Sequence, residues 1–530
     1  DAQAGAASEP PATAALRNAT QHVGAALAHL EAAGLLGGPL ADAPEVEAPR
    51  ALAAAVRCLT REQTPDLPER IAMHVAEGFA CYALYPEHYL LSLRASPLWP
   101  LAGRETVVIG VRSIGTALGG VVAGALAAGG GQVQAFSVRP GGHPYHRALA
   151  WEPWQSVIVR QAGPDAWFAV VDEGPGLSGS SFAAVGEALL DLGVPGRRIC
   201  FFPAHGHGPG SAADPAVHGV WQQVQVCPPP QDARIPFALP GWPSALHDAD
   251  RYPLAGAGTW EAAAPFERSA WLLPAHGDNP ATLLSFAGLG PHGITQVARA
   301  RAMAEAGWSA PLGPAADGYL ASTWPAPPGA SNQAPDSGNP AHLARLGAYL
   351  AHATQVYEEP GDPAAVLDTL LDMLYWNTWE AVDEEAAETT RRYAAPAWRH
   401  ALTESPLVAP PPGLRPDEWH VGADAGLTLA LPLGRQHGHP LPARADIAWS
   451  LAALVANWDL PPAGTDALLA AFVVSGGDSI SPQRRHFYGL AYAAFDAGRA
   501  KLAGDSTGDW TAYEAGRARL RAALRQTAPL

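Results

Sequence analysis

Lysine is almost absent from this chain of 530 residues: among its 33 lysine and arginine residues, Lys501 is the one lysine. The P-loop motif GxxxxGK[ST] is therefore excluded, because its lysine must reach the phosphates of a bound nucleotide. Any other mechanism that places a lysine against a phosphate group is almost excluded for the same reason. This absence narrows the phosphate chemistry that the chain can perform.

Cysteine and long apolar runs are also scarce. The four cysteines are Cys58, Cys81, Cys200 and Cys227, and none belongs to a CxxC pair. Their spacing supports neither a zinc site nor a disulfide framework, so we expect buried thiols in a cytoplasmic protein. No apolar run reaches the roughly 18 residues of a membrane span, since Arg112 and several glycines interrupt the longest candidate. We therefore expect no membrane partner.

Positive charge is lacking as well. The formal net charge is −17, which disfavours nucleic acid as a partner because nucleic-acid binding needs a cationic surface. Hydrophobic residues make up 48% of the chain and charged residues 16%, a composition typical of folded domains. The length predicts about two to four domains. The sequence does not indicate an oligomeric state.

The pattern of strands and helices divides the chain into four parts. The fold class predicted is α/β, with a parallel sheet followed by a mainly helical α+β domain, because strand and helix signals alternate with short turns between about 106 and 203. The strands expected there are 106–110, 132–138, 156–159, 167–171 and 198–203. The boundaries predicted are an N-terminal helical segment (1–68), the parallel-sheet domain (69–210), a proline-rich linker (211–255) and the mainly helical domain (256–530).

The stretch FAVVDEGPGLSGSSFAAV, residues 168–185, carries the clearest chemistry. A buried strand ends in two carboxylates, Asp172 and Glu173, and a glycine- and serine-rich turn then opens a helix. A helix N-terminus offers unpaired N–H groups to a phosphate, and glycines let the backbone approach it. The two carboxylates could hold sugar hydroxyls, directly or through Mg²⁺. The turn contributes Gly176, Ser178, Gly179, Ser180 and Ser181 as candidate binding residues.

This motif resembles the signature of type I phosphoribosyltransferases, over about residues 70–205. The family's acidic pair is separated from its phosphate loop by three residues, whereas four (174–177) intervene here. The resemblance implies a transferase that uses phosphoribosyl pyrophosphate and Mg²⁺ to glycosylate an acceptor that the sequence does not identify. It implies catalytic roles for Asp172, Glu173 and Arg112, with the two carboxylates as metal ligands. Arg112 and Mg²⁺ would neutralise the pyrophosphate that leaves.

Two further segments fit the same resemblance. TVVIGVRSIGTAL, residues 106–118, is similar to the family's pyrophosphate loop and would place Ser113, Gly115 and Thr116 at a helix N-terminus. SVRPGGHPYHR, residues 137–147, would be a loop that closes over the ligand, with Arg139 among its cationic groups. A dinucleotide-binding turn is the alternative for the first segment, although its GxxxxG spacing disfavours it. A nucleotide- or ribose-phosphate-binding regulator without turnover is the alternative for the whole domain.

The second half, about 256–525, weakly resembles aminoglycoside phosphotransferases and kinase-like folds through segments such as PDEW (416–419) and ADIAWSL (445–451). A kinase of this type needs a lysine on an early strand and an aspartate for Mg²⁺. Ser285 and Leu431 occupy the places where we would expect them. We therefore predict a domain without the usual phosphate chemistry, and an atypical phosphotransferase or an unrelated helical domain are the alternatives.

For three other features, we favour a structural role over a binding role. His205 and His207 form a histidine pair without a nearby third ligand, so a polar loop is favoured over a metal site. The acidic segment 380–388 is predicted to be a solvated helix face, with a metal or a basic partner as the alternatives. The tryptophans of the second half are predicted to pack helices against one another, with a ligand groove as the alternative; they include Trp376, Trp379, Trp398, Trp419, Trp449 and Trp458.

Overall fold

The computed structural model describes residue 21 and residues 77–99, 103–211, 213–230, 268–273, 281–324, 335–422, 426–435 and 442–526. It separates the chain into two compact units, which we describe one at a time. Unit 1 comprises Asp1–Gly78 and Leu84–His247, and unit 2 comprises Phe79–Ala83 and Asp248–Leu530. The helical segment expected over 1–68 and most of the linker expected over 211–255 lie outside the described residues.

Unit 1 is built on a parallel sheet of five strands in the order β2-β1-β5-β6-β7. Every neighbouring pair in this sheet is parallel. The central strands are buried along nearly their whole length, which is typical of a parallel sheet with helices on both faces. The strands are β1 (Glu105–Val111), β2 (Gln132–Val138), β5 (Trp167–Val171), β6 (Ile199–Phe202) and β7 (Gln225–Val226).

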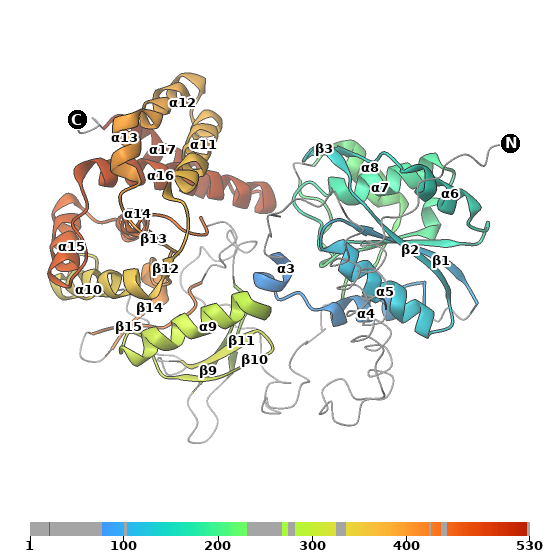
Figure 1. The fold of residues 1–530 in the computed structure, drawn as a ribbon, viewed down its shortest axis with the longest axis horizontal. Coiled ribbons are helices and arrows are strands. Elements are labelled where there is room, and N and C mark those ends of the chain that lie inside the picture. The colour runs from blue at the N-terminus through green and yellow to red at the C-terminus, as the bar shows by residue number, and fades with distance from the viewer. Residues whose placement is uncertain are drawn as a thin grey trace, which may run out of the picture. The chain divides into compact units, whose positions relative to one another are not determined.

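Helices cover this sheet, as Figure 1 shows with α4 and α5 on one face and α7 and α8 on the other. A short antiparallel hairpin, β3 (Gly141–His143) and β4 (His146–Ala148), follows β2. The core between the layers contains Val107, Ile109, Val170, Phe182 and Phe201. The helices are α4 (Pro86–Ala95), α5 (Gly115–Ala128), α6 (Pro153–Gln161), α7 (Ser180–Asp191) and α8 (Pro215–Gln223), with a 3₁₀ turn, η2 (Gly196–Arg198). The short helix α3 (Glu77–Ala80) contains residues of both units.

Two segments of unit 1 differ from the sequence-based expectation. Residues 156–159, expected as a strand, lie within α6, and α8 and β7 form inside the stretch expected as a linker. Both helices begin with a proline, Pro153 and Pro215. Proline is well suited to the first helical position, because the N–H that it lacks would have no intrahelical partner there. Pro153 and Pro215 therefore mark helix starts in this region.

Unit 2 begins with an antiparallel sheet of four strands in the order β10-β11-β9-β8. The strands are β8 (Ala270–Leu273), β9 (Thr282–Phe286), β10 (Leu312–Ala316) and β11 (Tyr319–Thr323), and α9 (Gly290–Glu305) connects β9 to β10. Two short antiparallel strand pairs follow among the helices: β12 (Glu358–Glu359) with β13 (Leu407–Val408), and β14 (Trp419–Val421) with β15 (Leu427–Leu429). Two 3₁₀ turns, η5 (Arg391–Ala394) and η6 (Pro416–Glu418), also lie there.

The rest of unit 2 is helical (Figure 1). Its core contains Leu346, Leu374, Trp449 and Phe487, which are all at most 1% exposed. Asp383 separates α11 from α12, because its side chain caps the start of α12 by accepting a hydrogen bond from the N–H of Ala386. The helices are α10 (Pro340–Val356), α11 (Pro363–Ala381), α12 (Glu384–Thr390), α13 (Pro396–Leu402), α14 (Ile447–Asn457), α15 (Pro462–Val474), α16 (Pro482–Thr507) and α17 (Thr511–Leu524).

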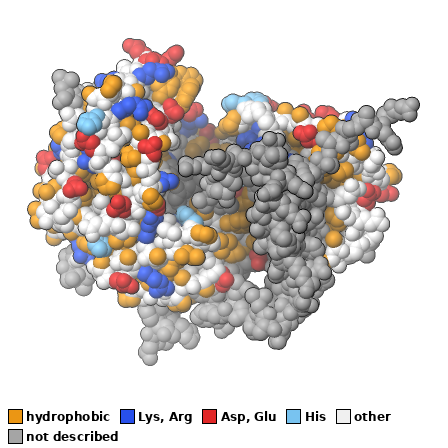
Figure 2. Space-filling model, viewed as in Figure 1, with side chains coloured by type: hydrophobic (Ala, Val, Ile, Leu, Met, Phe, Trp, Pro, Cys, Tyr) orange, Lys and Arg blue, Asp and Glu red, His pale blue; other side chains and the backbone are white. Residues whose placement is uncertain are grey.

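The coarse fold prediction is confirmed: the protein is a mixed α/β protein with a mainly helical C-terminal part. None of the helices in the described ranges combines the length and the apolar composition that a membrane crossing requires. On the face drawn in Figure 2, acidic and basic side chains of the described residues are interspersed, with no broad basic patch.

Candidate functional site

The carboxyl ends of β1 and β5 meet at the middle of the unit 1 sheet. The chain leaves β1 through α5 toward β2 on one side, whereas β5 lies on the other side of β1. The order of strands therefore reverses between β1 and β5, where Gly110 is paired with Val171. In open α/β sheets this topological switch point is the usual place for a ligand, in the crevice outside the carboxyl ends of the strands.

The turn after β1 brings the N-terminus of α5 against this switch point. A Cβ atom on Gly110 would lie 2.2 Å from the carbonyl oxygen of Gly115, so the strand and the helix approach too closely for any side chain. A Cβ atom on Gly115 would lie 2.5 Å from the carbonyl oxygen of Val171 and 3.1 Å from Oδ1 of Asp172. Ser113 and Thr116, also expected at the site, flank Gly115 in this turn. The glycines thus allow the α5 N-terminus and the acidic pair to lie side by side.

Arg112 is exposed at the same turn, but its side chain is engaged with the end of β2. Its Nε donates to Oγ of Ser137 over 3.0 Å, and its guanidinium donates to the carbonyl oxygen of Ser137 over 3.2 Å. Arg139, at the end of the same strand, is exposed. Both arginines lie near the carboxyl edge of the sheet.

Asp172 follows β5 and is held by backbone groups. Its Oδ1 accepts the N–H of Glu173 over 2.9 Å, and the hydroxyl of Tyr89 donates to its carbonyl oxygen over 2.7 Å. Burial raises the pKa of Asp172 from 3.8 to about 7, and the Glu173 N–H and the charge of Arg147 offset only part of this rise. A carboxyl group in this state gains strongly from any cation that arrives beside it.

The serine-rich turn after the acidic pair opens α7. Gly179 has φ = 58° and accepts the indole N–H of Trp221 at its carbonyl, and a Cβ on Gly179 would lie 2.8 Å from Pro209. The hydroxyls of Ser178 and Ser180 are 3.1 Å apart, and Ser181 is half-buried beside them. The first turn of α7 carries no acidic side chain, and its N-cap residue, Gly179, supplies no side-chain cap. The N–H of Ser180 bonds to Oγ of Ser178 over 3.4 Å, and the N–H groups that follow it in this turn have no intrahelical partner and suit an anion. Gly176, between the acids and the serines, is exposed.

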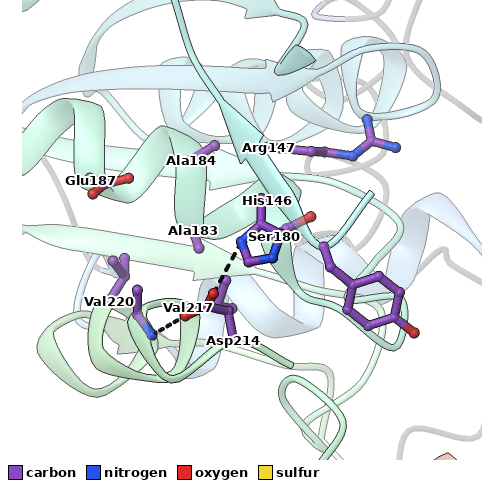
Figure 3. A pocket seen from close by; sticks show the side chains of 11 residues that line it. His146, Arg147, Ser180, Ala183, Ala184, Glu187, Asp214, Val217 and Val220 are labelled. Atoms are coloured by element: carbon purple, nitrogen blue, oxygen red, sulfur yellow. Dashed lines mark hydrogen bonds and ion pairs between the residues drawn. The ribbon is translucent and has the colours of Figure 1, made fainter. Parts of the chain in front are cut away.

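The β3–β4 hairpin lies against this first turn of α7. The hydroxyl of Ser180 donates to the carbonyl oxygen of Pro144 at the hairpin tip. His146 forms an ion pair of 3.0 Å with Asp214, the N-cap residue of α8, as the dashed line in Figure 3 shows. Hairpin, α7 and α8 together enclose a cavity of about 180 Å³, which Arg147 also lines (Figure 3). Ser180 lines this cavity, and the acidic pair does not.

The histidine pair lies in the loop after β6. The rings of His205 and His207 are 5.3 Å apart, and burial together with the neighbouring His207 lowers the pKa of His205. In the described ranges, no three histidine, cysteine, aspartate or glutamate side chains gather in a group that could hold a metal ion. A Mg²⁺ ion would thus need ligand oxygens in addition to the Asp172 and Glu173 carboxylates.

In unit 2, the two places where we expected a kinase lysine and a kinase aspartate are both buried. Ser285 is buried in β9, paired with Leu320, and Leu431 is buried in the turn after β15. A cluster of charged side chains beside Leu431 was not predicted from the sequence. Asp417 forms ion pairs with both Arg415 and Arg435.

Glu418, next to Asp417, is used entirely by the backbone. Its carboxylate accepts N–H groups from Gly413 and Arg435 over 2.7 Å each and a third from Arg415 over 3.4 Å. Burial and the charge of Asp417 raise the pKa of Glu418, against the effect of these hydrogen bonds. The two carboxylates of this cluster are therefore poor candidates for holding Mg²⁺, since arginines and amides already occupy them.

Comparison with known proteins gives matches among solved structures only; no protein-family model and no curated protein matches the chain. The choline kinase LicA from Streptococcus pneumoniae is 14% identical, with a TM-score of 0.35, over 51% of this chain and 91% of its own. A choline/ethanolamine kinase family protein from Mesorhizobium loti is 18% identical, with a TM-score of 0.35, over 52% and 94%. An aminoglycoside 2′-phosphotransferase IIIa mutant in complex with GDP is 15% identical, with a TM-score of 0.31, over 51% and 89%.

These matches correct the first of our two resemblances. The prediction of a phosphoribosyltransferase is wrong as the chain's main relationship: the solved structures similar to it are choline and ethanolamine kinases and an aminoglycoside phosphotransferase. The functional expectation built on it, a glycosyltransferase that consumes phosphoribosyl pyrophosphate, is withdrawn with it. The likeness to kinase-like folds, which we expected as the weaker of the two, is the one shared by these structures, over about half of the chain.

Proposed function

We propose that this protein binds a nucleotide or another phosphorylated small molecule at the carboxyl edge of the unit 1 sheet, and that it acts as a binding, regulatory protein. The observation that carries the proposal is the switch point between β1 and β5. Two helix N-termini, an acidic pair and a glycine- and serine-rich turn meet there.

The parts of such a ligand match the groups at this edge. A phosphate carries negative charge and accepts hydrogen bonds, so it suits the uncapped first turn of α7 and the hydroxyls of Ser178 and Ser181. A sugar carries hydroxyl donors, so it suits the carboxylates of Asp172 and Glu173. Mg²⁺ in proteins is commonly held by one or two carboxylates together with ligand phosphates, and this pair fits that mode of binding.

Ser181→Glu is the sharpest test of the phosphate end. A carboxylate in the first turn of a helix stabilises the helix through its dipole but repels an anion from the same amides. We expect AMP, ATP and ribose 5-phosphate, titrated calorimetrically in the presence of Mg²⁺, to bind the wild type and to lose at least about tenfold in affinity in the variant. We expect the variant to keep the stability of the wild type, and a thermal unfolding curve of both proteins distinguishes a loss of binding from a loss of folding.

Ser156→Glu is the matched control. Ser156 lies in the first turns of α6, away from the switch point, and bonds to the carbonyl oxygen of Pro153. It changes the net charge by the same amount and should leave the affinity unchanged. Equal loss of affinity in both variants would show that net charge causes the effect. Equal affinity of the wild type and Ser181→Glu would contradict a phosphate site at the N-terminus of α7.

Phosphotransfer in unit 2 is a second candidate, and one observation favours it: arginines and acids converge around Asp417. Arginine can neutralise phosphate charge as lysine does. Asp417 is the carboxylate of this cluster that retains exposure, 30% of its side chain. We would test this with ATP and choline or ethanolamine as acceptors: phosphorylated product that disappears in Asp417→Asn supports transfer, and ATP consumption indistinguishable from buffer excludes it under those conditions.

A further inference from the structure

Two tryptophans stand out on the surface of unit 2. Trp376 is 60% exposed and Trp379 is 47% exposed, and their rings lie 6.1 Å apart in an edge-to-face arrangement. By contrast, Trp449 and Trp458 in the same unit are 1% and 3% exposed. Our expectation that these tryptophans pack helices is therefore wrong for Trp376 and Trp379. Neighbouring exposed aromatic rings are uncommon on a surface that has no partner.

The two rings are not needed by the core beneath them. Along α11, the buried positions are Leu367, Leu370, Leu374, Thr378 and Ala381, which recur at helical spacing on the inner face. Trp376 and Trp379 lie on the opposite face. The helix is thus held in place by other residues, and the aromatic pair is available for contacts with another molecule.

Carboxylates surround the aromatic pair. Asp372 is exposed one turn before Trp376, and Glu384 and Glu385 are exposed just beyond the end of the helix. In the described ranges, none of these three carboxylates forms an ion pair. Glu380, also exposed, reaches Lys501 over 3.0 Å. Figure 2 shows red atoms beside orange ones over the helices that Figure 1 labels α11 and α12.

The chain already contains one example of how such a surface binds a cation. The guanidinium of Arg391 lies over the ring of Tyr375, 4.5 Å from its centre, and its Nε lies 2.7 Å from a carboxylate oxygen of Glu388. Tyr375 in turn contacts Trp376, with ring centres 5.2 Å apart. An aromatic face beside a carboxylate is thus occupied by arginine at one end of this aromatic row.

We propose that the outer face of α11, centred on Trp376 and Trp379, is the docking surface for an arginine- or lysine-bearing segment of a partner protein. Charge complementarity selects this occupant: the rings attract a cation through their faces, and the flanking carboxylates attract it by charge. Tryptophan also dominates the energy of many protein interfaces. Nucleic acid and anionic membrane do not fit, because the surface is acidic. The proposal is independent of the proposed function in unit 1.

The test is a pair of fluorescently labelled peptides with the same length and sequence. One repeats Gly-Ser-Arg, and in the other citrulline replaces each arginine, which removes the charge but keeps the shape. We expect the full-length protein to bind the arginine peptide and not the citrulline peptide in anisotropy titrations at about 0.15 M ionic strength. Trp376→Ser/Trp379→Ser should weaken that binding about tenfold or more, because truncation of a central interface tryptophan has effects of this size.

Val474→Ser is the matched control. Val474 is the end residue of α15 and is 88% exposed, so its replacement removes exposed apolar surface elsewhere without changing the charge. It should leave peptide affinity unchanged. Equal binding by the wild type and the double tryptophan variant would overturn the proposal, because attraction would then come from net charge alone. A self-association seen in sedimentation velocity that disappears in the double variant would also overturn it, since a second copy of the chain would then be the occupant.

Discussion

Asp172→Asn tests whether burial raises the pKa of the Asp172 carboxyl group in the folded protein. In the folded protein, burial raises the pKa of this carboxyl from 3.8 to about 7. The folded state therefore binds a proton more tightly than the unfolded state, and stability falls as the pH rises from about 4 through about 7. Asparagine has a similar shape and does not titrate. The variant should lack this part of the pH dependence.

The size of the effect follows from the two pKa values. Between pH 5 and pH 8 the wild type traverses about two pKa units below the folded value, which corresponds to about 3 kcal/mol at about 1.4 kcal/mol per unit. Partial exposure of the side chain lowers this, so we expect about 2 kcal/mol. Mg²⁺ together with a bound phosphorylated ligand should reduce it further, because a cation beside the carboxyl lowers its pKa.

Hydrogen exchange measured by mass spectrometry gives this quantity locally. Peptides that cover β5 and the start of α7 report the opening free energy of the site, once intrinsic exchange rates are corrected for pH. The wild type should lose about 2 kcal/mol of protection between pH 5 and pH 8 relative to Asp172→Asn. Asp191→Asn, at the exposed end of α7, should behave as the wild type does. The same pH dependence in wild type and Asp172→Asn would refute the reasoning.

Two further predictions concern stability, at the turn that contains Gly179 in unit 1 and at the buried ion pair of Asp446 in unit 2. Gly179→Ala should destabilise unit 1 by about 1–3 kcal/mol in urea unfolding, because the backbone there is left-handed and Pro209 would meet the new Cβ; unchanged stability would show that the turn can adopt another conformation. Asp446→Ala should destabilise unit 2 by about 3–5 kcal/mol in the same measurement, because it leaves the guanidinium of Arg484 buried without its partner. The Asp446→Ala/Arg484→Leu double variant should recover part of that loss, and no recovery would contradict an ion-pair origin.

Much of the secondary structure could be predicted from the sequence, because local patterns determine it. The strand expected at 132–138 matches β2, and the one at 167–171 matches β5, since apolar β-branched and aromatic runs ended by glycine or acidic turns are hard to interpret otherwise. In unit 2, apolar residues at helical spacing predict helices over about 340–357 and 446–457, and these match α10 and α14. Residues 156–159 failed because four apolar-rich residues do not distinguish a strand from a helix turn.

The candidate site was predictable only in part. Asp172 and the serine turn could be placed at a strand end, because a strand followed by a helix fixes that geometry locally. The contact between Ser180 and Pro144 and the pair between His146 and Asp214 could not, since each joins segments far apart in sequence. The arginine–acid cluster around Asp417 was missed for the same reason, as Arg435 lies eighteen residues away along the chain.

Because the chain has a single lysine, arginine is the main cationic partner for its carboxylates. Which carboxylates have an arginine partner therefore indicates where a ligand-borne cation could bind. Two of the four buried carboxylates among the described residues of unit 2 are held by arginine side chains. Asp446 is held by Arg484, whose planar fork binds both oxygens, and Asp496 is held by Arg499 and Arg519. Burial alone would raise the pKa of Asp496, but its two arginines hold that pKa below its ordinary value. Asp172 is half-buried, and among the described residues its carboxylate accepts a backbone N–H and no arginine, so burial raises its pKa instead. The two aspartates differ in their partners, and the one without an arginine has the most to gain from a cation that a ligand brings. We therefore expect ligand binding to lower the pKa of Asp172 more than the pKa of Asp496.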